Sequence, residues 1–280
     1  MEKVTLESLV EAVNDLPALP QIVLKVMKLT ESPNATAQEI SDALNQDQAL
    51  AAKVLRLANS AFYGFPRRIS TVTDATVFLG FKTVRSIVMA VSVCDLLSKE
   101  IEGYALAPGE LWRHSQCVAI SARLIAKRVK FFTVDVAYTA GLLHDIGKVV
   151  LNSSMKQAYH EVVAKVDTEN LPFNEAEDQI LGFNHAEVGA RIAEKWNLPP
   201  ELVDAIAYHH QPDQSKINRQ LTSIVHVADA ISVSMGMGIG IDGMLYPLSQ
   251  DALQFLKFDE NEIEGTVSQL VDLFVDQQSF

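Results

Sequence analysis

Apolar side chains recur at intervals of three and four residues along almost the whole chain, and strictly alternating apolar and polar stretches are scarce. The first spacing places side chains on one face of an α-helix, whereas alternation is typical of a half-buried β-strand. The sequence therefore predicts an all-α fold. The expected helices cover residues 6–16, 20–30, 37–45, 47–59, 73–79, 82–97, 110–129, 134–151, 154–167, 173–181, 185–196, 199–210, 218–233, 248–256 and 260–275.

The helical pattern is interrupted once over a longer stretch, where Gly103, Pro108 and Gly109 lie close together. Glycine and proline in such a cluster are typical of a connection between elements. We therefore expect a histidine-free helical part at residues 1–105 and a second helical part at residues 106–280.

Composition excludes several functions. The net charge is −12 and the pI about 5.0, which argues against nucleic-acid binding, because that needs a basic surface. The chain begins MEKVTLESLVEAV, without the basic and apolar segments of a signal peptide, and no window is apolar enough for a membrane span. Cys94 and Cys117 lie far apart in the sequence, each in apolar helical surroundings. We therefore expect two buried, reduced thiols and no disulfide. We expect a cytoplasmic protein that binds neither nucleic acid nor membrane.

All seven histidines lie between residues 110 and 229, six of them in a string interleaved with acidic residues, and the first hundred residues contain none. Imidazole and carboxylate together are the usual ligands of iron, manganese, nickel and zinc, so this distribution predicts a metal site. The residues run Glu110-x3-His114, His144-Asp145-x2-Lys148, His185, His209-His210 and His226-x2-Asp229.

Spacing and burial support this interpretation. Glu110 and His114 are four residues apart and share one helix face, and His144 and Lys148 have the same spacing, with Asp145 beside them. The surrounding AYTAGLLHDIGKVV is otherwise apolar, so these three polar residues should be buried. Burial of such groups is costly unless they are paired or bind a metal. A metal centre is therefore favoured over an ordinary buried hydrogen-bonded network.

The remaining polar residues are less informative singly. His185 opens a predicted helix, where a histidine is more often a capping or surface residue. His209 and His210 point about 100° apart on a helix, so both reach one cluster only at a helix end that faces a cavity. Asp229 lies in the apolar stretch HVADAISV, where an unpaired carboxylate is costly. His226 fits a donor behind the ligands or a satisfied core histidine better than a ligand.

The stretch GLLHDIGK closely resembles the signature of the HD superfamily of metal-dependent phosphohydrolases, in which a histidine, a His-Asp pair and a distant aspartate occur in that order. His114, His144-Asp145 and Asp229 match this pattern. The full set of polar residues resembles the extended, two- or three-metal site of HD-GYP phosphodiesterases. That resemblance implies a divalent metal cofactor, with iron or manganese favoured and nickel, zinc or magnesium also compatible.

The same resemblance implies a role for each residue. Asp145 would bridge two ions, Lys148 would face the substrate phosphate, and Glu110 would serve a third ion. The other ligands would divide between the two ions, with His114, His144 and Asp229 on one and His185, His209 and His210 on the other. After the double histidine, however, the chain reads HHQPDQSKIN and lacks the Asp-Gly-x-Gly-Tyr-Pro stretch of HD-GYP enzymes. Cyclic di-GMP hydrolysis is therefore not expected.

The first hundred residues resemble a narrower family. LPALPQIVLKVMKLT and KVLRLANSAFYGFPRRISTVTDATVFLGFKTVRSIV closely resemble the HDOD domain, the HD-related output domain of bacterial signalling proteins, and the likeness runs from about residue 16 to about residue 233. It implies a multi-helical HD-type domain packed against an N-terminal helical subdomain. Many HDOD domains have lost metal ligands and act through protein contacts, whereas this chain has the full set.

Two functions fit these observations. The HDOD resemblance and the missing GYP stretch favour a stand-alone signalling output protein with an HD-type, dinuclear metal centre and a signalling protein as its partner. The alternative is an active phosphohydrolase of phosphodiesterase or nucleotidase type, acting on a phosphorylated small molecule. In that enzyme a metal-bound hydroxide would be the nucleophile, with Asp145 and Lys148 as the catalytic residues.

Overall fold

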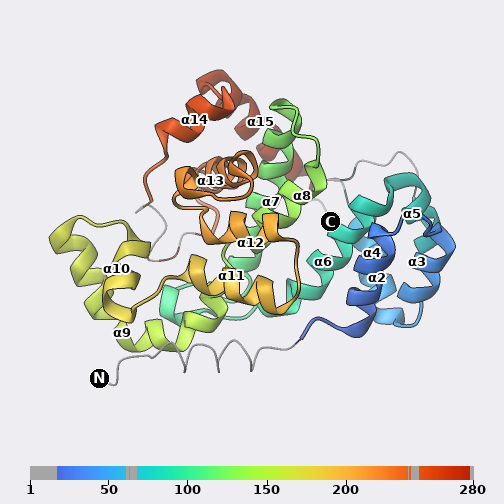
Figure 1. Ribbon diagram of the computed structural model, residues 1–280, viewed down its shortest axis with the longest axis horizontal. Coiled ribbons are helices and arrows are strands. Elements are labelled where there is room, and N and C mark those ends of the chain that lie inside the picture. The colour runs from blue at the N-terminus through green and yellow to red at the C-terminus, as the bar shows by residue number, and fades with distance from the viewer. Residues whose placement is uncertain (1–17, 61–62, 64–67, 239, 241–245, 278–280) are drawn as a thin grey trace. The chain divides into compact units, whose positions relative to one another are not determined.

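The computed structural model describes residues 18–60, 63, 68–238, 240 and 246–277, and the regular elements in this part of the chain are helices (Figure 1). The all-α prediction is confirmed. The helix predicted over residues 6–16 lies outside the described residues. The described chain forms two compact units, a central unit over Leu96–Val267 and an N-terminal unit over Leu19–Asp95 together with the residues from Ser268 on. The predicted division into domains after residue 105 remains a prediction.

The N-terminal unit is built from short helices with apolar inner faces. Val23, Ile40 and Val54 have no exposed surface and come from three different helices. Asn59 ends one helix, and its side chain pairs with both backbone groups of Ile69, each at 2.8 Å, which explains a polar residue in an apolar stretch. The helices are α2 (Gln21–Glu31), α3 (Ala37–Leu44), α4 (Gln48–Ala58), α5 (Val72–Leu79) and most of α6 (Phe81–Leu97).

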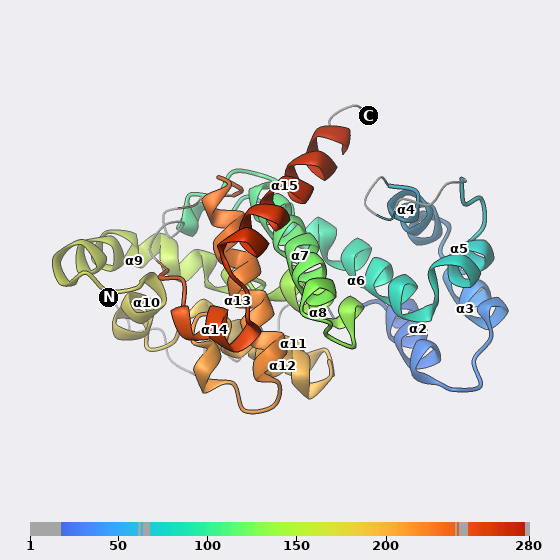
Figure 2. The same cartoon turned by 90° about the horizontal axis from the view of Figure 1, so that it is seen from above.

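The central unit carries the predicted ligands. Its elements are η1 (Glu102–Tyr104), α7 (Glu110–Arg128), α8 (Val134–Leu143), α9 (Gly147–Glu169), α10 (Phe173–Leu181), α11 (His185–Lys195), α12 (Pro200–Ala207), η2 (Pro212–Gln214), α13 (Arg219–Ser234), α14 (Gln250–Leu256) and the start of α15 (Glu260–Gln277). Helix α7 packs on α8 and α13, while α9 contacts η1, α10 and α11 (Figure 1). Helix α14 lies against α13 (Figure 2). These contacts bring α7, α11 and α13 around the turn between α8 and α9.

One predicted helix is wrong in a way that matters for the site. The pattern predicts a continuous helix over residues 134–151, whereas α8 ends at Leu143 and α9 begins at Gly147 and continues to Glu169. The intervening turn closes with a hydrogen bond from the Ile146 N–H to the Leu143 carbonyl. At Gly147 the chain approaches α11 so closely that a Cβ atom would lie 1.9 Å from the His185 carbonyl oxygen. The turn therefore depends on a glycine at its exit.

Two predictions from composition concern cysteines and membranes. Cys94 and Cys117 are both free thiols, and Cys117 is buried, as the sequence indicates. In the part of the chain that the structure describes, no helix combines the length and apolar character that crossing a membrane requires.

Candidate metal centre

Three ligand-type side chains from α7, the α8–α9 turn and α13 form one cluster, in which the ligand atoms lie within 4.8 Å of one another. His114 Nε2 is 3.1 Å from Asp229 Oδ1 and 3.3 Å from His144 Nε2. His144 Nε2 lies 3.7 Å from the same Asp229 oxygen. All three residues are buried. The structure thus assembles one of the two ligand groups that the sequence implies.

A second cluster joins the beginning of α11 to the end of α12. The ligand atoms of His185, His209 and His210 also lie within 4.8 Å of one another, and His185 Nε2 is 2.8 Å from His210 Nε2. Helix α12 ends at Ala207, so the adjacent histidines follow in a turn and are not held to helical directions. The expectation that they sit at a helix end is confirmed. Its position alone favours a capping or surface role for His185, but none of its surface is exposed, and Asn184 provides the side-chain cap of α11.

Asp145 lies between the clusters and faces both. Its Oδ2 atom is 3.4 Å from His144 Nε2 and 3.5 Å from His114 Nε2. Its Oδ1 atom is 3.4 Å from His185 Nε2 and 3.8 Å from His209 Nε2. One carboxylate oxygen is therefore directed at each cluster, which is the arrangement that a bridging ligand requires.

Acceptors outside the clusters orient four of the histidines. The Nδ1 contacts are those of His114 with Met237 O at 2.9 Å, His144 with Gly141 O at 2.8 Å, His209 with Ile206 O at 2.7 Å and His185 with Glu177 Oε2 at 2.7 Å. A carbonyl oxygen only accepts, so Nδ1 carries the proton in His114, His144 and His209, and an ionised carboxylate requires the same of His185; each ring then presents Nε2 to the cluster. Metal-binding histidines are commonly oriented by such an outer acceptor.

Electrostatics favours positive charge between the carboxylates. Burial raises the pKa of Asp145, but the positive charges of His144 and Lys148 outweigh it and hold that pKa well below its usual 3.8. Burial likewise lowers the pKa of His144, yet Asp145 and Asp229 together raise it to about 10. By contrast, burial and the charges of His144 and His185 lower the pKa of His209 to about 3. Protons and divalent ions compete for the same histidine Nε2 atoms. A bound ion would therefore replace the proton on His144 as the source of positive charge between the carboxylates.

Two buried atoms show that a metal suits this residue set. Asp145 Oδ1 and His209 Nε2 have no hydrogen-bond partner among the described residues. Each unsatisfied buried polar atom costs about 1–3 kcal/mol. The two atoms lie 3.8 Å apart, and both offer a lone pair to the same space. A hydrogen bond between them would satisfy both only if one carried a proton, whereas a cation satisfies both at once.

A small cavity of about 10 Å³ lies within the site. Lys148 is in its wall, 5% exposed, with Nζ 2.7 Å from Asp145 Oδ2 and 5.5 Å from the centre of the Tyr104 ring. Tyr246 also lines the cavity, with its ring stacked on that of His210 at 3.9 Å between centroids. Among the described residues, this volume has room for about one water-sized group. The catalytic roles of Asp145 and Lys148 remain predictions.

Glu110 is placed differently from the other predicted ligands. Its carboxylate accepts a hydrogen bond from the Ala107 N–H at 2.7 Å and lies 3.6 Å from the Arg113 guanidinium. None of the clusters found among the described residues includes it. Its side chain is 29% exposed, so it has neither the burial nor the direction of the other ligands. Its role toward a third ion remains a prediction.

His226 agrees with its predicted place behind the ligands. Its Nδ1 contacts the His209 carbonyl oxygen at 2.8 Å, and its Nε2 accepts from the Ser249 N–H at 2.9 Å. Both ring nitrogens are therefore used away from the clusters. His226 supports the turn that carries His209 and His210.

Three residues at the site were missed by sequence reasoning. Glu177 has no exposed surface and contacts His185. Because its carboxylate lies on the same helix face as Phe173, the sequence could have identified it. Tyr104 lies in the segment interpreted only as a boundary, yet its hydroxyl donates to Glu177. Tyr246 follows a glycine-rich stretch and had no local signal.

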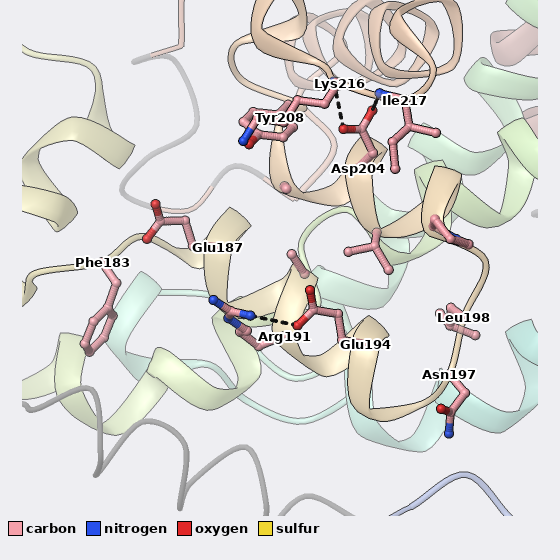
Figure 3. A pocket seen from close by; sticks show the side chains of 14 residues that line it. Phe183, Glu187, Arg191, Glu194, Asn197, Leu198, Asp204, Tyr208, Lys216 and Ile217 are labelled. Carbon is pink, nitrogen blue, oxygen red and sulfur yellow. Dashed lines mark hydrogen bonds and ion pairs between the residues drawn. The ribbon is translucent and has the colours of Figure 1, made fainter.

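A larger hollow, of about 820 Å³, runs along α11 and α12 toward the segment that precedes α13 (Figure 3). In its wall Arg191 contacts Glu194 at 2.9 Å, and the Asp204 carboxylate accepts from the Lys216 N–H at 2.9 Å. Among the described residues that line it, none belongs to the metal clusters. The chemistry is therefore assigned to the smaller cavity.

A model of the HDOD domain matches residues 16–212, more than half of the chain. The chain belongs to the HDOD domain family. Its sequence resemblance to this family, and through it to the HD superfamily, is confirmed. The fold is similar to that of an HDOD domain protein with unknown function from Geobacter sulfurreducens, with a TM-score of 0.70, 30% identity and coverage of 96% of this chain and 90% of that one. It is also similar to a candidate phosphohydrolase from Shewanella amazonensis, with a TM-score of 0.67, 27% identity and coverage of 94% and 97%.

Curated relatives match over shorter shares of their length. An uncharacterized protein of Treponema pallidum is 28% identical over 229 residues, which cover 79% of this HDOD chain and 43% of that protein. Ribonuclease Y of Thermus thermophilus is 31% identical over 122 residues, which cover 44% of this chain and 16% of the enzyme. The chain therefore spans less than half the length of these relatives.

Proposed function

We propose that this HDOD protein is a signalling protein whose central unit holds two divalent metal ions, one in each ligand cluster, with Asp145 bridging them. The observation that carries the proposal is the pair of unsatisfied buried atoms, Asp145 Oδ1 and His209 Nε2, which face each other between the clusters. A further supporting feature is that Asp145 directs its other oxygen at His114 and His144.

The donor set indicates the class of metal. The cluster of His114, His144 and Asp229 contains both imidazole nitrogens and a carboxylate oxygen, and Asp145 directs a carboxylate oxygen at the three-histidine cluster. This mixture suits iron and manganese and also accommodates nickel or zinc. Magnesium prefers oxygen ligands, so the histidine-rich cluster disfavours it. Bound ions would supply Lewis-acid polarisation of a phosphoryl oxygen.

The size of the cavity favours signalling through a protein partner over turnover of a bulky substrate. Small-molecule sites usually measure about 300–1,000 Å³. The cavity at the metal centre is about 10 Å³ and is lined by the Tyr246 ring. In this conformation the ions would stabilise the packing of α7, α11 and α13 around the α8–α9 turn, and a signalling protein would recognise the resulting surface.

Hydrolysis of a phosphate ester is the second candidate function, and Lys148 favours it. Its ammonium group is buried beside Asp145 in the wall of the cavity, where it would neutralise charge that develops on a phosphoryl group. Two relatives have names of this kind, the Shewanella amazonensis candidate phosphohydrolase and ribonuclease Y. Because the chain carries a net charge of −12, a phosphorylated small molecule suits it better than RNA as a substrate.

Metal analysis of protein purified without oxygen tests the main proposal. We expect two metal ions per chain in the wild type and fewer in the Asp145→Asn and His209→Ala variants. His160→Ala is the matched control, because this exposed histidine on α9 lies outside both clusters. Fewer than one ion per wild-type chain would refute the proposal. Turnover of bis(p-nitrophenyl) phosphate by the Mn(II)- or Fe(II)-loaded protein, lost in Lys148→Met, would establish the second candidate.

A further inference from the structure

Glu177, on α10, is a fully buried carboxylate outside both ligand clusters. Its Oε2 atom accepts hydrogen bonds from the His185 backbone N–H at 3.0 Å and from His185 Nδ1 at 2.7 Å. Its Oε1 atom accepts from the Tyr104 hydroxyl at 2.5 Å. All three partners donate, so the group acts only as an acceptor, which is the behaviour of an ionised carboxylate.

This contact makes His185 different from the other oriented histidines. The Nδ1 atoms of His114, His144 and His209 contact backbone carbonyl oxygens, whereas that of His185 contacts a carboxylate. A charged acceptor makes a stronger hydrogen bond than a neutral one and increases the basicity of the opposite ring nitrogen. The opposite nitrogen is His185 Nε2, which lies 3.4 Å from Asp145 Oδ1.

Tyr104 holds Glu177 in this position. The tyrosine is fully buried in η1, and its ring meets that of His185 edge-on, with 6.3 Å between the centroids and 85° between the planes. The 3₁₀ turn is itself held to α9 by a hydrogen bond from the Gly103 N–H to the Asn152 side chain at 2.8 Å. Glu177 therefore has a fixed neighbour on each side.

We propose that Glu177, held by Tyr104, is a positioning residue that sets the affinity of the ion bound by His185, His209 and His210, and that it leaves the ion bound by His114, His144 and Asp229 unaffected. The inference rests on the metal centre proposed above. Loss of such an outer partner lowers metal affinity by about 10- to 100-fold. Because the contact involves His185 alone, the loss is confined to one of the two ions.

Titration of metal-free protein with Co(II), followed by calorimetry and by visible absorption, separates the two ions. The variants are Glu177→Gln, which keeps the shape and removes the charge, and Tyr104→Phe, which removes one hydroxyl. Glu175→Gln is the matched control, since Glu175 lies on the same helix and belongs to neither ligand cluster. We expect Glu177→Gln to weaken one Co(II) site about 10- to 100-fold and to change only its absorption, with a smaller effect of Tyr104→Phe on the same site.

Three results would overturn the inference. Wild-type affinity at both sites in Glu177→Gln, or equal weakening at both sites, shows that the carboxylate does not act on one ion. If Glu177→Gln does not fold, Tyr104→Phe decides alone, and unchanged binding at both sites refutes the inference. A wild-type chain that binds no Co(II) refutes the proposed metal centre itself, which distinguishes that failure from the failure of Glu177.

Discussion

Gly147 provides a direct test of how the α8–α9 turn places the His-Asp pair. A Cβ atom at this position would lie 1.9 Å from the His185 carbonyl oxygen and 2.7 Å from the Gly189 backbone nitrogen. Both neighbours are backbone atoms of α11, so relief requires α9 and α11 to separate. Overpacking typically costs about 1–3 kcal/mol and more where the neighbours are rigid. We expect Gly147→Ala to lower the free energy of unfolding by about 3 kcal/mol or more.

The matched control is Gly189→Ala, the same change on the facing helix. There a Cβ atom would meet a side-chain atom, Ile206 Cγ2, at 2.9 Å, and the nearest backbone atom, the Gly147 nitrogen, only at 3.4 Å. Alanine also has about 0.5–1 kcal/mol of advantage over glycine inside a helix, so this variant should lose much less stability. Urea unfolding followed by tryptophan fluorescence is suitable, because Trp112 and Trp196, the two tryptophans of the chain, both lie in the central unit. A Gly147→Ala protein as stable as Gly189→Ala would refute the close approach of α9 and α11.

Three further predictions concern the site and its surroundings. Asp204 accepts from the Ser215 hydroxyl at 2.6 Å and from three successive backbone N–H groups, so Asp204→Ala should cost about 2–4 kcal/mol in urea unfolding. Burial raises the pKa of Asp204, but these hydrogen bonds outweigh that effect and lower the pKa below 3.8. The contribution of Asp204 to the free energy of unfolding is therefore complete above about pH 4 and is lost as the pH falls further. An Asp204→Asn variant whose stability has the same pH dependence as the wild type would contradict this. Tyr246→Ala should speed Mn(II) uptake by metal-free protein in stopped-flow measurements, because the ring lines the cavity, and unchanged uptake would show that it does not limit access. Mn(II) at about 100 times the Kd of each site should stabilise the wild type by about 2.7 kcal/mol per bound ion in thermal unfolding, and equal stabilisation of Asp145→Asn at the same Mn(II) concentration would count against the bridge.

The all-α fold and the convergence of the ligands were predictable from local pattern and motif order. Apolar spacing identifies helices because each helix buries one face, and it located α10 over the same residues as the structure, Phe173–Leu181. The His209-His210 pair was informative because adjacent side chains diverge on a helix, which required a helix end. His226 was kept out of the predicted ligand set, and in the structure both its ring nitrogens make contacts elsewhere.

The features that were missed depend on contacts between distant segments. The turn before Gly147 interrupts a stretch whose apolar residues keep helical spacing on both sides, so periodicity could not reveal it. Its cause is the approach of α11, about forty residues further along the chain. Tyr104 meets Glu177 only because η1 packs on α9, and no local pattern encodes that contact. Among these features, only Glu177 has a sequence signal: a carboxylate on an apolar helix face is buried and therefore needs a partner.

Anomalous diffraction from crystals grown with Mn(II) tests the central claim most directly, because it locates each ion without reference to activity. We expect two peaks on either side of Asp145, one beside His114, His144 and Asp229 and the other beside His185, His209 and His210. Loss of both or either of these peaks in Asp145→Asn crystals would agree with a bridging carboxylate. Crystals of the wild type with no peak beside Asp145, at Mn(II) concentrations that load other manganese proteins, would contradict the proposed metal centre.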